Sequence, residues 1–356
     1  MTGAPVFVTG ATGFVGGLVA ARLLAEGRHV RALVRRPGDA ARLSPWGPAG
    51  PPEPAAEPAT EPPGRLEPVT GDLDDPDSLA RAAEGAEVAY HVAGLNALCL
   101  RDPAPLYRVN VDGTRNLLRA AASAGLRRVV LTSSAATLGA HGKGPGEPAD
   151  ETAGPPERFT SHYARSKYEA EVLALGFDGV EVVAVNPSSV QGPGRRTGTA
   201  RLFLDFLNGK LPFDVPAEFG LCFTDDCAAG HLLAEAKGAP GQRYVLNGAT
   251  LTSRAALDLV AGLAGIEGRP RTLPPAVARG LAGLAEAAAA VRGRQPRLCR
   301  ETVRTLTQPH RYDGSRATRE LGLRYTPIER ALALTLRWYA ANDLVTRPLP
   351  ALPSGR

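Results

Sequence analysis

The stretch VFVTGATGFVG, residues 6–16, decides the fold. It begins with apolar and β-branched residues typical of a buried strand, and residues 18–24 after it have helical periodicity. A strand, a glycine turn and a helix in this order is the layout of a dinucleotide site. We expect Gly10 to allow a tight turn, Gly13 to let the backbone approach a pyrophosphate, and Gly16 to let the helix pack closely on the strand.

The helix that follows the turn strengthens this interpretation, because its N-terminus offers free N–H groups and partial positive charge to phosphates. The glycine spacing is G-x-x-G-x-x-G, and not the commoner G-x-G-x-x-G. Such a pattern is weak alone, and the alternative is a plain glycine-rich turn between a strand and a helix. Its place directly after a buried strand favours a nucleotide site.

Composition excludes several classes of protein. The 356 residues are 44% hydrophobic and 22% charged, with a net charge of +5. Scattered basic residues do not indicate nucleic-acid binding, and the arginines of residues 292–319 are read as a solvated helical face. No H-x-x-x-H pair suggests a metal, and no apolar run reaches the roughly 18–20 residues of a membrane span. We expect a cytoplasmic enzyme that acts on a small molecule.

The four cysteines are Cys99, Cys222, Cys227 and Cys299, and none forms a C-x-x-C pair. We interpret them as free thiols in a reducing compartment.

The second expected strand, residues 29–34, ends in Arg35 and Arg36. An NAD site usually has an acidic residue here for the ribose hydroxyls, whereas arginine suits the 2′-phosphate of NADP. The sequence therefore favours NADP(H), and NAD(H) remains the alternative. Both arginines pointing to solvent is the plainer interpretation, and Asp39 is a weaker acidic rival.

Residues 44–64 contain eight prolines. Such a segment is predicted to be an extended, mobile insertion in a surface loop, because proline disrupts both helices and sheet ladders. A proline-rich ligand for a partner domain is the alternative.

Strands and helices then alternate, which predicts an α/β fold: a Rossmann-type, doubly wound parallel sheet with helices on both faces. Expected strands are residues 66–70, 88–92, 128–132 and 180–185, and expected helices include 76–84, 105–124 and 159–175. We predict a cofactor domain at residues 1–187 and a smaller substrate lobe at 188–345, whose late elements partly return to the first domain.

Ligands bind beyond the carboxyl ends of parallel strands. Four groups fall at such ends: residues 10–16, Asp72, Ala93-Gly94 and Ser133-Ser134. Their convergence is stronger evidence for a ligand site than any single motif.

Tyr163 and Lys167 lie four residues apart, hence on one face of the expected helix. A free phenol has a pKa near ~10, and a fixed cation favours its ionised form. We therefore expect Lys167, together with the positive ring of an oxidised nicotinamide, to lower the pKa of Tyr163, and Ser134 to hold the substrate oxygen beside the phenol. A Tyr-x-x-x-Lys pair alone also occurs by chance on helices.

Together these motifs resemble the extended short-chain dehydrogenase/reductase family. The segments that carry the resemblance are 9–16, 71–73, 91–94, 110–114, 132–134, 163–167, 186–187 and 223–231. It implies catalysis by Ser134, Tyr163 and Lys167, with Asp72 at the adenine and Asn110 supporting an active-site water or the helix geometry. The cofactor-binding residues that it implies are Gly10, Thr12, Gly13, Phe14, Val15, Gly16, Arg35, Asp72, Leu73, Ala93, Gly94, Asn110, Tyr163, Lys167 and Pro187. Family members also suggest a homodimer through residues 105–124 and 159–175.

Two departures narrow the family resemblance. No carboxylate follows Ser134 in residues 135–139, which disfavours a 4,6-dehydratase. Phe219 stands where UDP-sugar epimerases place a diphosphate-binding arginine. The pattern is most similar to the dihydroflavonol-reductase-like and 3β-hydroxysteroid-dehydrogenase-like branch, and hopanoid-associated sugar epimerases share it.

We therefore hypothesise an NADP(H)-dependent oxidoreductase that interconverts a carbonyl and a secondary alcohol on a small, largely apolar substrate. The alternatives are an NAD-dependent sugar or nucleotide-sugar epimerase that retains its cofactor, and a cofactor-sensing binding module. Binding modules usually lose the tyrosine or the lysine, and both are present here.

Overall fold

The computed structural model describes residues 3–45, 47–50, 63–139, 146–296 and 298–351. Its centre is a seven-stranded sheet in the order β10-β6-β5-β4-β1-β2-β3, with every neighbouring pair parallel. The strands are β1 (Val6–Thr9), β2 (Val30–Val34), β3 (Leu66–Thr70), β4 (Val88–His91), β5 (Arg128–Thr132), β6 (Glu181–Pro187) and β10 (Arg243–Leu246). The predicted Rossmann-type sheet is thus confirmed.

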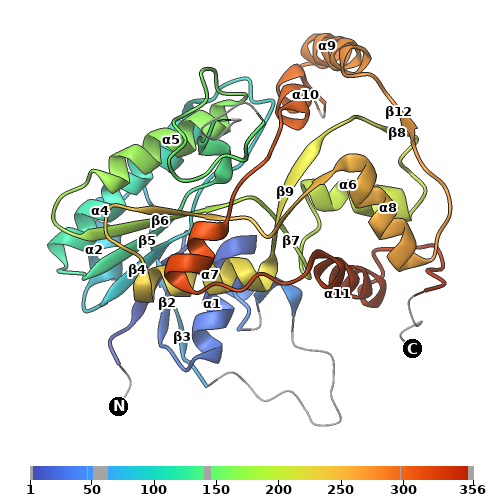
Figure 1. The fold of residues 1–356 in the computed structure, drawn as a ribbon. Coiled ribbons are helices and arrows are strands. Elements are labelled where there is room, and N and C mark those ends of the chain that lie inside the picture. Colours follow the sequence, from blue (N-terminus) through green and yellow to red (C-terminus); the bar gives the residue numbers. More distant parts are fainter. Residues whose placement is uncertain (1–2, 46, 51–62, 140–145, 297, 352–356) are drawn as a thin grey trace.

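Alternation along each strand builds two hydrophobic layers. In β1, Val6 and Val8 pack in the cluster on one face of the sheet, while Phe7 packs in the cluster on the other. The first cluster includes α1 (Phe14–Ala25) and α7 (Thr224–Lys237). The second includes α2 (Pro76–Ala83), α4 (Gly113–Ser123) and α5 (His162–Leu175). Figure 1 shows helices on both faces, as a doubly wound sheet requires.

The expected helix at 105–124 is continuous but not uniform. It comprises α3 (Ala104–Tyr107), a π-helical turn at Arg108–Asp112, and α4. At the turn the Thr114 hydroxyl donates to the Asn110 carbonyl at 2.6 Å. Packing imposes this irregularity, and π-turns recur at functional sites. The expected helix at 159–175 begins only at His162, where the Ser161 hydroxyl caps it by accepting from the Ala164 N–H.

Further elements follow β6, and β10 returns to the central sheet among them. The three-stranded sheet holds β7 (Ser189–Gln191), β9 (Glu218–Phe223) and β11 (Ala249–Thr252), and a two-stranded one holds β8 (Phe213–Asp214) and β12 (Arg271–Thr272). The remaining helices are α6 (Thr199–Leu207), α8 (Ser253–Ala264), α9 (Pro275–Val291), α10 (Arg300–Thr307) and α11 (Ile328–Ala341). The domain boundary at residue 187 stays a prediction.

The proline-rich segment is partly ordered. Gly47–Ala49 forms a 3-10 turn, against the expectation that no helical structure forms there. The Ala49 carbonyl accepts from the Trp338 indole N–H at 2.8 Å, and Pro48 lies beside Gly17 of α1. Tertiary contacts therefore hold a piece that local propensity does not. Residues 51–62, where the prediction of an extended chain mainly falls, lie outside the described residues.

Candidate active site

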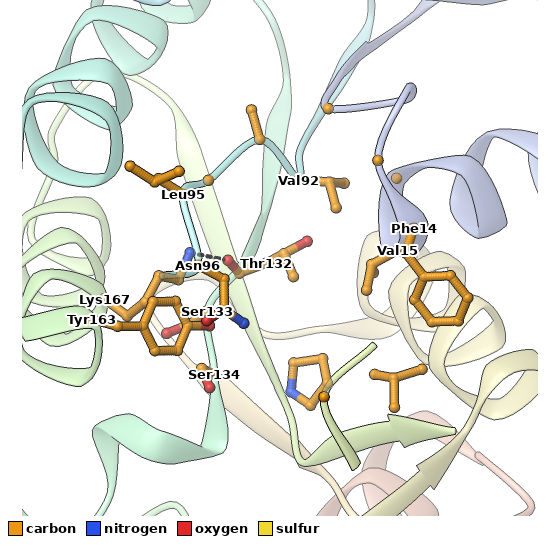
Figure 2. Close-up of a pocket in the computed structure, with 18 of the residues that line it drawn as sticks. Phe14, Val15, Val92, Leu95, Asn96, Thr132, Ser133, Ser134, Tyr163 and Lys167 are labelled. Carbon is orange, nitrogen blue, oxygen red and sulfur yellow. Dashed lines mark hydrogen bonds between the residues drawn. The ribbon is translucent and has the colours of Figure 1, made fainter. Parts of the chain in front are cut away.

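A cavity of about 660 Å³ opens at the carboxyl ends of the central strands. This is the size of a small-molecule or cofactor site. Every predicted site residue except Asn110 lines it. Figure 2 shows Tyr163, Lys167 and Ser134 on one side, and Phe14 and Val15 of α1 on the other.

The glycine turn forms one wall. Gly10 has φ +76°, and a Cβ there would lie 2.6 Å from the Ala93 nitrogen. A Cβ on Gly16 would lie 2.1 Å from the Gly10 carbonyl oxygen, whereas one on Gly13 would lie 3.1 Å from that atom. Gly16 therefore closes the helix onto the turn, and Gly13 is the less enclosed of the two.

The start of α1 suits a phosphate-bearing cofactor. No acidic residue lies in its first turn, and no side chain caps it at Gly13. The N–H groups of that turn and the helix dipole face the cavity beside glycines that keep the cradle free of side chains. These residues fit the pyrophosphate of a dinucleotide, the group that the sequence pattern implies.

Polar groups gather near the end of β2 and β3. Arg35, Asp39 and Asp72 all line the cavity, and Arg35 is exposed. Arg42, which sequence reasoning missed, also lines it and lies 3.7 Å from the Asp39 carboxylate. The Asp39 carboxylate therefore already has a basic neighbour, which makes Asp39 a weaker candidate for binding the ribose hydroxyls.

Tyr163 and Lys167 project from the first turns of α5. The Lys167 ammonium donates to the Thr132 carbonyl at the end of β5, at 2.6 Å. Ser134 begins a 3-10 turn, and its oxygen accepts from the Ala136 N–H at 3.2 Å. Because that N–H uses an acceptor site on the oxygen, the hydroxyl proton is free to point elsewhere.

The prediction that Lys167 lowers the pKa of Tyr163 is wrong. Burial raises the pKa of Tyr163 above its usual value, while a hydrogen bond with Ser134 and the charge of Arg195 lower it. Lys167 does not contribute. Burial also lowers the pKa of Lys167 to about 8, although Glu171 acts against that shift. The buried Lys167 ammonium thus binds the Thr132 carbonyl and does not form the predicted pair with the Tyr163 phenol.

Asn110 does not reach the cavity wall. Its side-chain oxygen accepts from the Leu95 N–H at 2.7 Å, and its amide donates to the Leu95 carbonyl and to Ser166. It therefore fixes the backbone after β4, and direct cofactor contact is not supported. Its expected role in supporting an active-site water or the helix geometry stays a prediction.

A buried network of hydrogen bonds and an ion pair holds the Ser134 backbone in place. The Asn186 amide donates to the Ser134 carbonyl at 3.2 Å and to the Glu171 carboxylate at 2.5 Å. Glu171 also pairs with Arg243 at 2.7 Å. Sequence reasoning placed Asn186 in a motif but missed Glu171, whose spacing one turn beyond Lys167 is the signal available.

Several lining residues come from distant parts of the chain. Arg195 lies in the loop after β7, Phe219 is on β9, and Thr305, His310 and Tyr312 lie on or after α10. Of these, only Phe219 has a sequence signal, its place in the epimerase pattern; the others lie in segments that only the fold brings to the cavity.

The prediction of four free thiols is wrong for one pair. Cys99 and Cys299 form a disulfide across 200 residues, whereas Cys222 and Cys227 are free and buried. The bond joins the loop after β4 to the start of α10. Glu301 adds to this link by accepting from the Cys99 N–H at 2.6 Å and the His162 N–H at 3.0 Å. Sequence separation hid the pair, and cysteine usage no longer supports the reducing compartment inferred from it.

Known proteins share this architecture. The sequence model of the NAD dependent epimerase/dehydratase family matches residues 6–246. A putative dihydroflavonol 4-reductase of Synechocystis sp. is 36% identical over 351 residues, covering 95% of both chains. A 3 beta-hydroxysteroid dehydrogenase/Delta 5→4-isomerase of Mycobacterium tuberculosis is 32% identical, over 68% of this chain and 65% of its own.

A solved structure agrees in fold. The dTDP-glucose 4,6-dehydratase DesIV of Streptomyces venezuelae, solved with NAD bound, superposes with a TM-score of 0.73 at 25% identity, covering 95% of this chain and 98% of its own. Among the described residues, no helix is both long and apolar enough to span a membrane. The chain is a member of the NAD-dependent epimerase/dehydratase family, within the extended short-chain dehydrogenases/reductases, and is an NAD(P)-dependent oxidoreductase.

Proposed function

We propose that the protein is an NADP(H)-dependent oxidoreductase that interconverts a carbonyl and a secondary alcohol on a small, largely apolar substrate. The observation that carries this proposal is the meeting of Ser134, Tyr163 and Lys167 on the cavity wall opposite the glycine turn. The relatives named as a dihydroflavonol reductase and a hydroxysteroid dehydrogenase support the same chemistry.

In this mechanism Tyr163 donates a proton to the carbonyl oxygen in the reducing direction and accepts it in the other. Ser134 donates its hydroxyl proton to the same oxygen. Bound NADP(H) supplies or accepts the hydride. Because burial raises the pKa of the phenol, Tyr163 is protonated at neutral pH and suited to donate. Lys167 positions the end of β5 through Thr132 and offers its remaining protons to the nicotinamide ribose.

The NADP(H) preference rests on Arg35, which is exposed and lines the cavity, as Arg42 also does. Two guanidinium groups suit a ribose phosphate. The apolar substrate rests on Phe219, Leu306 and Tyr312, which line the cavity, with Phe219 in the place of a diphosphate-binding arginine.

The test measures net NADPH oxidation with a panel of ketones and aldehydes. We expect Tyr163→Phe to lower kcat by about 10²–10⁴-fold, because the proton donor is lost. Tyr168→Phe is the matched control, since Tyr168 lies on the same helix against Phe159 and does not line the cavity. Equal turnover by Tyr163→Phe and wild type would refute the proposal. Tightly retained NAD without net consumption of added cofactor would favour the epimerase instead.

We also propose a homodimer through α4 and α5. Val172 on α5 is 53% exposed, so its apolar side chain is available at the surface of the proposed interface. Light scattering of wild type and Val172→Glu tests this, with a shift to monomer expected.

A further inference from the structure

Among the described residues, Arg195 is a partly buried guanidinium of the cavity lining that has no anionic partner. Arg195 lines the wall, its buried Nε has no hydrogen-bond partner, and its Cζ lies 4.9 Å from the centre of the Phe14 ring. Other arginines with shielded side chains are paired: Arg128 with Glu181 at 2.7 Å, and Arg243 with Glu171 at 2.7 Å. Within the described residues no carboxylate lies within ion-pair distance of Arg195.

The surroundings of Arg195 disfavour an isolated charge. Burial lowers its pKa, and the groups that act against that shift are Tyr163, Tyr339 and Cys227, with no carboxylate among them. A partly dehydrated cation is costly unless it is paired and hydrogen-bonded. Its stack on Phe14 offsets part of that cost, because aromatic faces attract guanidinium groups.

The loop around Arg195 places the side chain before any ligand arrives. Gly192, Gly194 and Gly198 all have positive φ, which other residues rarely adopt. A Cβ on Gly194 would lie 2.8 Å from the backbone of Pro48, and one on Gly192 would overlap Thr224. The loop is therefore clamped between the 3-10 turn at Gly47–Ala49 and α7.

We propose that Arg195 is a substrate-binding residue that takes a carboxylate on an otherwise apolar substrate. The inference rests on the proposed oxidoreductase function and specifies its substrate. A single guanidinium matches one carboxylate through two parallel hydrogen bonds. The other cations lining the cavity have different tasks: Lys167 donates to Thr132, and Arg35 and Arg42 lie near the ends of β2 and β3.

The test measures equilibrium binding by calorimetry to the protein saturated with NADP⁺. The probes are cinnamate and cinnamamide, which share size and shape but differ in charge. We expect wild type to bind cinnamate at least tenfold more tightly than the amide, and Arg195→Met to bind both within twofold of each other. Arg196→Met is the matched control, because Arg196 is exposed, stacks on Trp338 at 5.3 Å and does not line the cavity. It should keep the preference.

Two further titrations separate the sources of an anion. NADPH should bind Arg195→Met within about twofold of wild type. A tenfold loss of NADPH affinity with the cinnamate preference intact would overturn the proposal and assign Arg195 to the cofactor pyrophosphate. UDP binding that depends on Arg195 and exceeds cinnamate binding would overturn it in favour of a nucleotide-sugar ligand. Absence of any carboxylate preference in wild type would also overturn it.

These binding measurements do not depend on turnover. The proposal for Arg195 can therefore be refuted while the proposed oxidoreductase function still holds, and the reverse is also possible. Thermal unfolding of Arg195→Met, compared with wild type, checks the fold. A second readout is the pKa of Tyr163, which the charge of Arg195 lowers. The pH profile of carbonyl reduction should move to higher pH in Arg195→Met and stay in place in Arg196→Met.

Discussion

The two walls of the cavity are built in different ways. The wall at the glycine turn comes from one continuous stretch, in which Gly10, Gly13 and Gly16 shape the backbone themselves. The rest of the lining comes from distant segments: Tyr163 from α5, Arg195 from a loop that stacks on Phe14, and Tyr312 from after α10. The wall built from residues 10–16, which we call the local wall, suits a ligand common to the whole family. The lining built from distant segments, which we call the assembled wall, can vary with the substrate.

The largest expected effect breaks the local wall. Gly16→Ala should lower the free energy of unfolding by about 4 kcal/mol or more, because its Cβ would lie 2.1 Å from a backbone oxygen that cannot move aside. Gly13→Ala is the comparison, since its Cβ would lie 3.1 Å from the same atom. It should keep its stability within about 1 kcal/mol and lose cofactor affinity. Urea unfolding and NADPH titration measure both, and equal destabilisation would contradict the division of roles.

The disulfide tests the assembled wall. Cys99→Ser should lower the free energy of unfolding by about 2–4 kcal/mol, the usual contribution of a native disulfide, because the bond restricts the unfolded chain. Urea unfolding with and without dithiothreitol checks this. Reductant should destabilise wild type and leave Cys99→Ser unchanged. If reductant has no effect on wild type, the bond does not form in solution.

Lys167 gives a pH dependence of stability. Its folded pKa of about 8 lies below the ordinary value of 10.5, so the folded state binds fewer protons than the unfolded state between these values. The penalty for burying the ammonium is full below pH 8 and is relieved as the pH rises. Wild type should therefore gain about 2 kcal/mol relative to Lys167→Met between pH 8 and pH 10. If the free energies of unfolding of the two proteins change equally with pH, Lys167 is not desolvated.

The smallest expected effect concerns cofactor choice at the edge of the local wall. Arg35→Ser should weaken NADPH binding about tenfold, because a charge-assisted bond to the 2′-phosphate is lost, and leave NADH binding nearly unchanged. Arg36→Ser is the control, since Arg36 does not line the cavity. Equal affinity of wild type for NADPH and NADH would remove the role given to Arg35.

Prediction from sequence succeeded where structure depends on neighbours along the chain. The glycine turn, the first six strands of the parallel sheet and the shared face of Tyr163 and Lys167 all follow from periodicity and spacing, whereas only the structure places β10 in that sheet. It failed for the π-turn at Asn110, because Thr114 and the packing around it decide that geometry. It also failed for the ordered turn at Gly47–Ala49, which contacts α1 and Trp338.

The sequence by itself determined which elements follow one another along the chain. These include a strand with its phosphate-binding turn, and a helix that carries a phenol and an ammonium on one face. Only the tertiary structure decided the state of those groups. Burial raises the pKa of Tyr163 and lowers that of Lys167, and desolvation depends on every segment packed around a site. The same holds for the unpaired Arg195 and for the bond between Cys99 and Cys299, because residues far apart in sequence become neighbours only when the whole chain has folded.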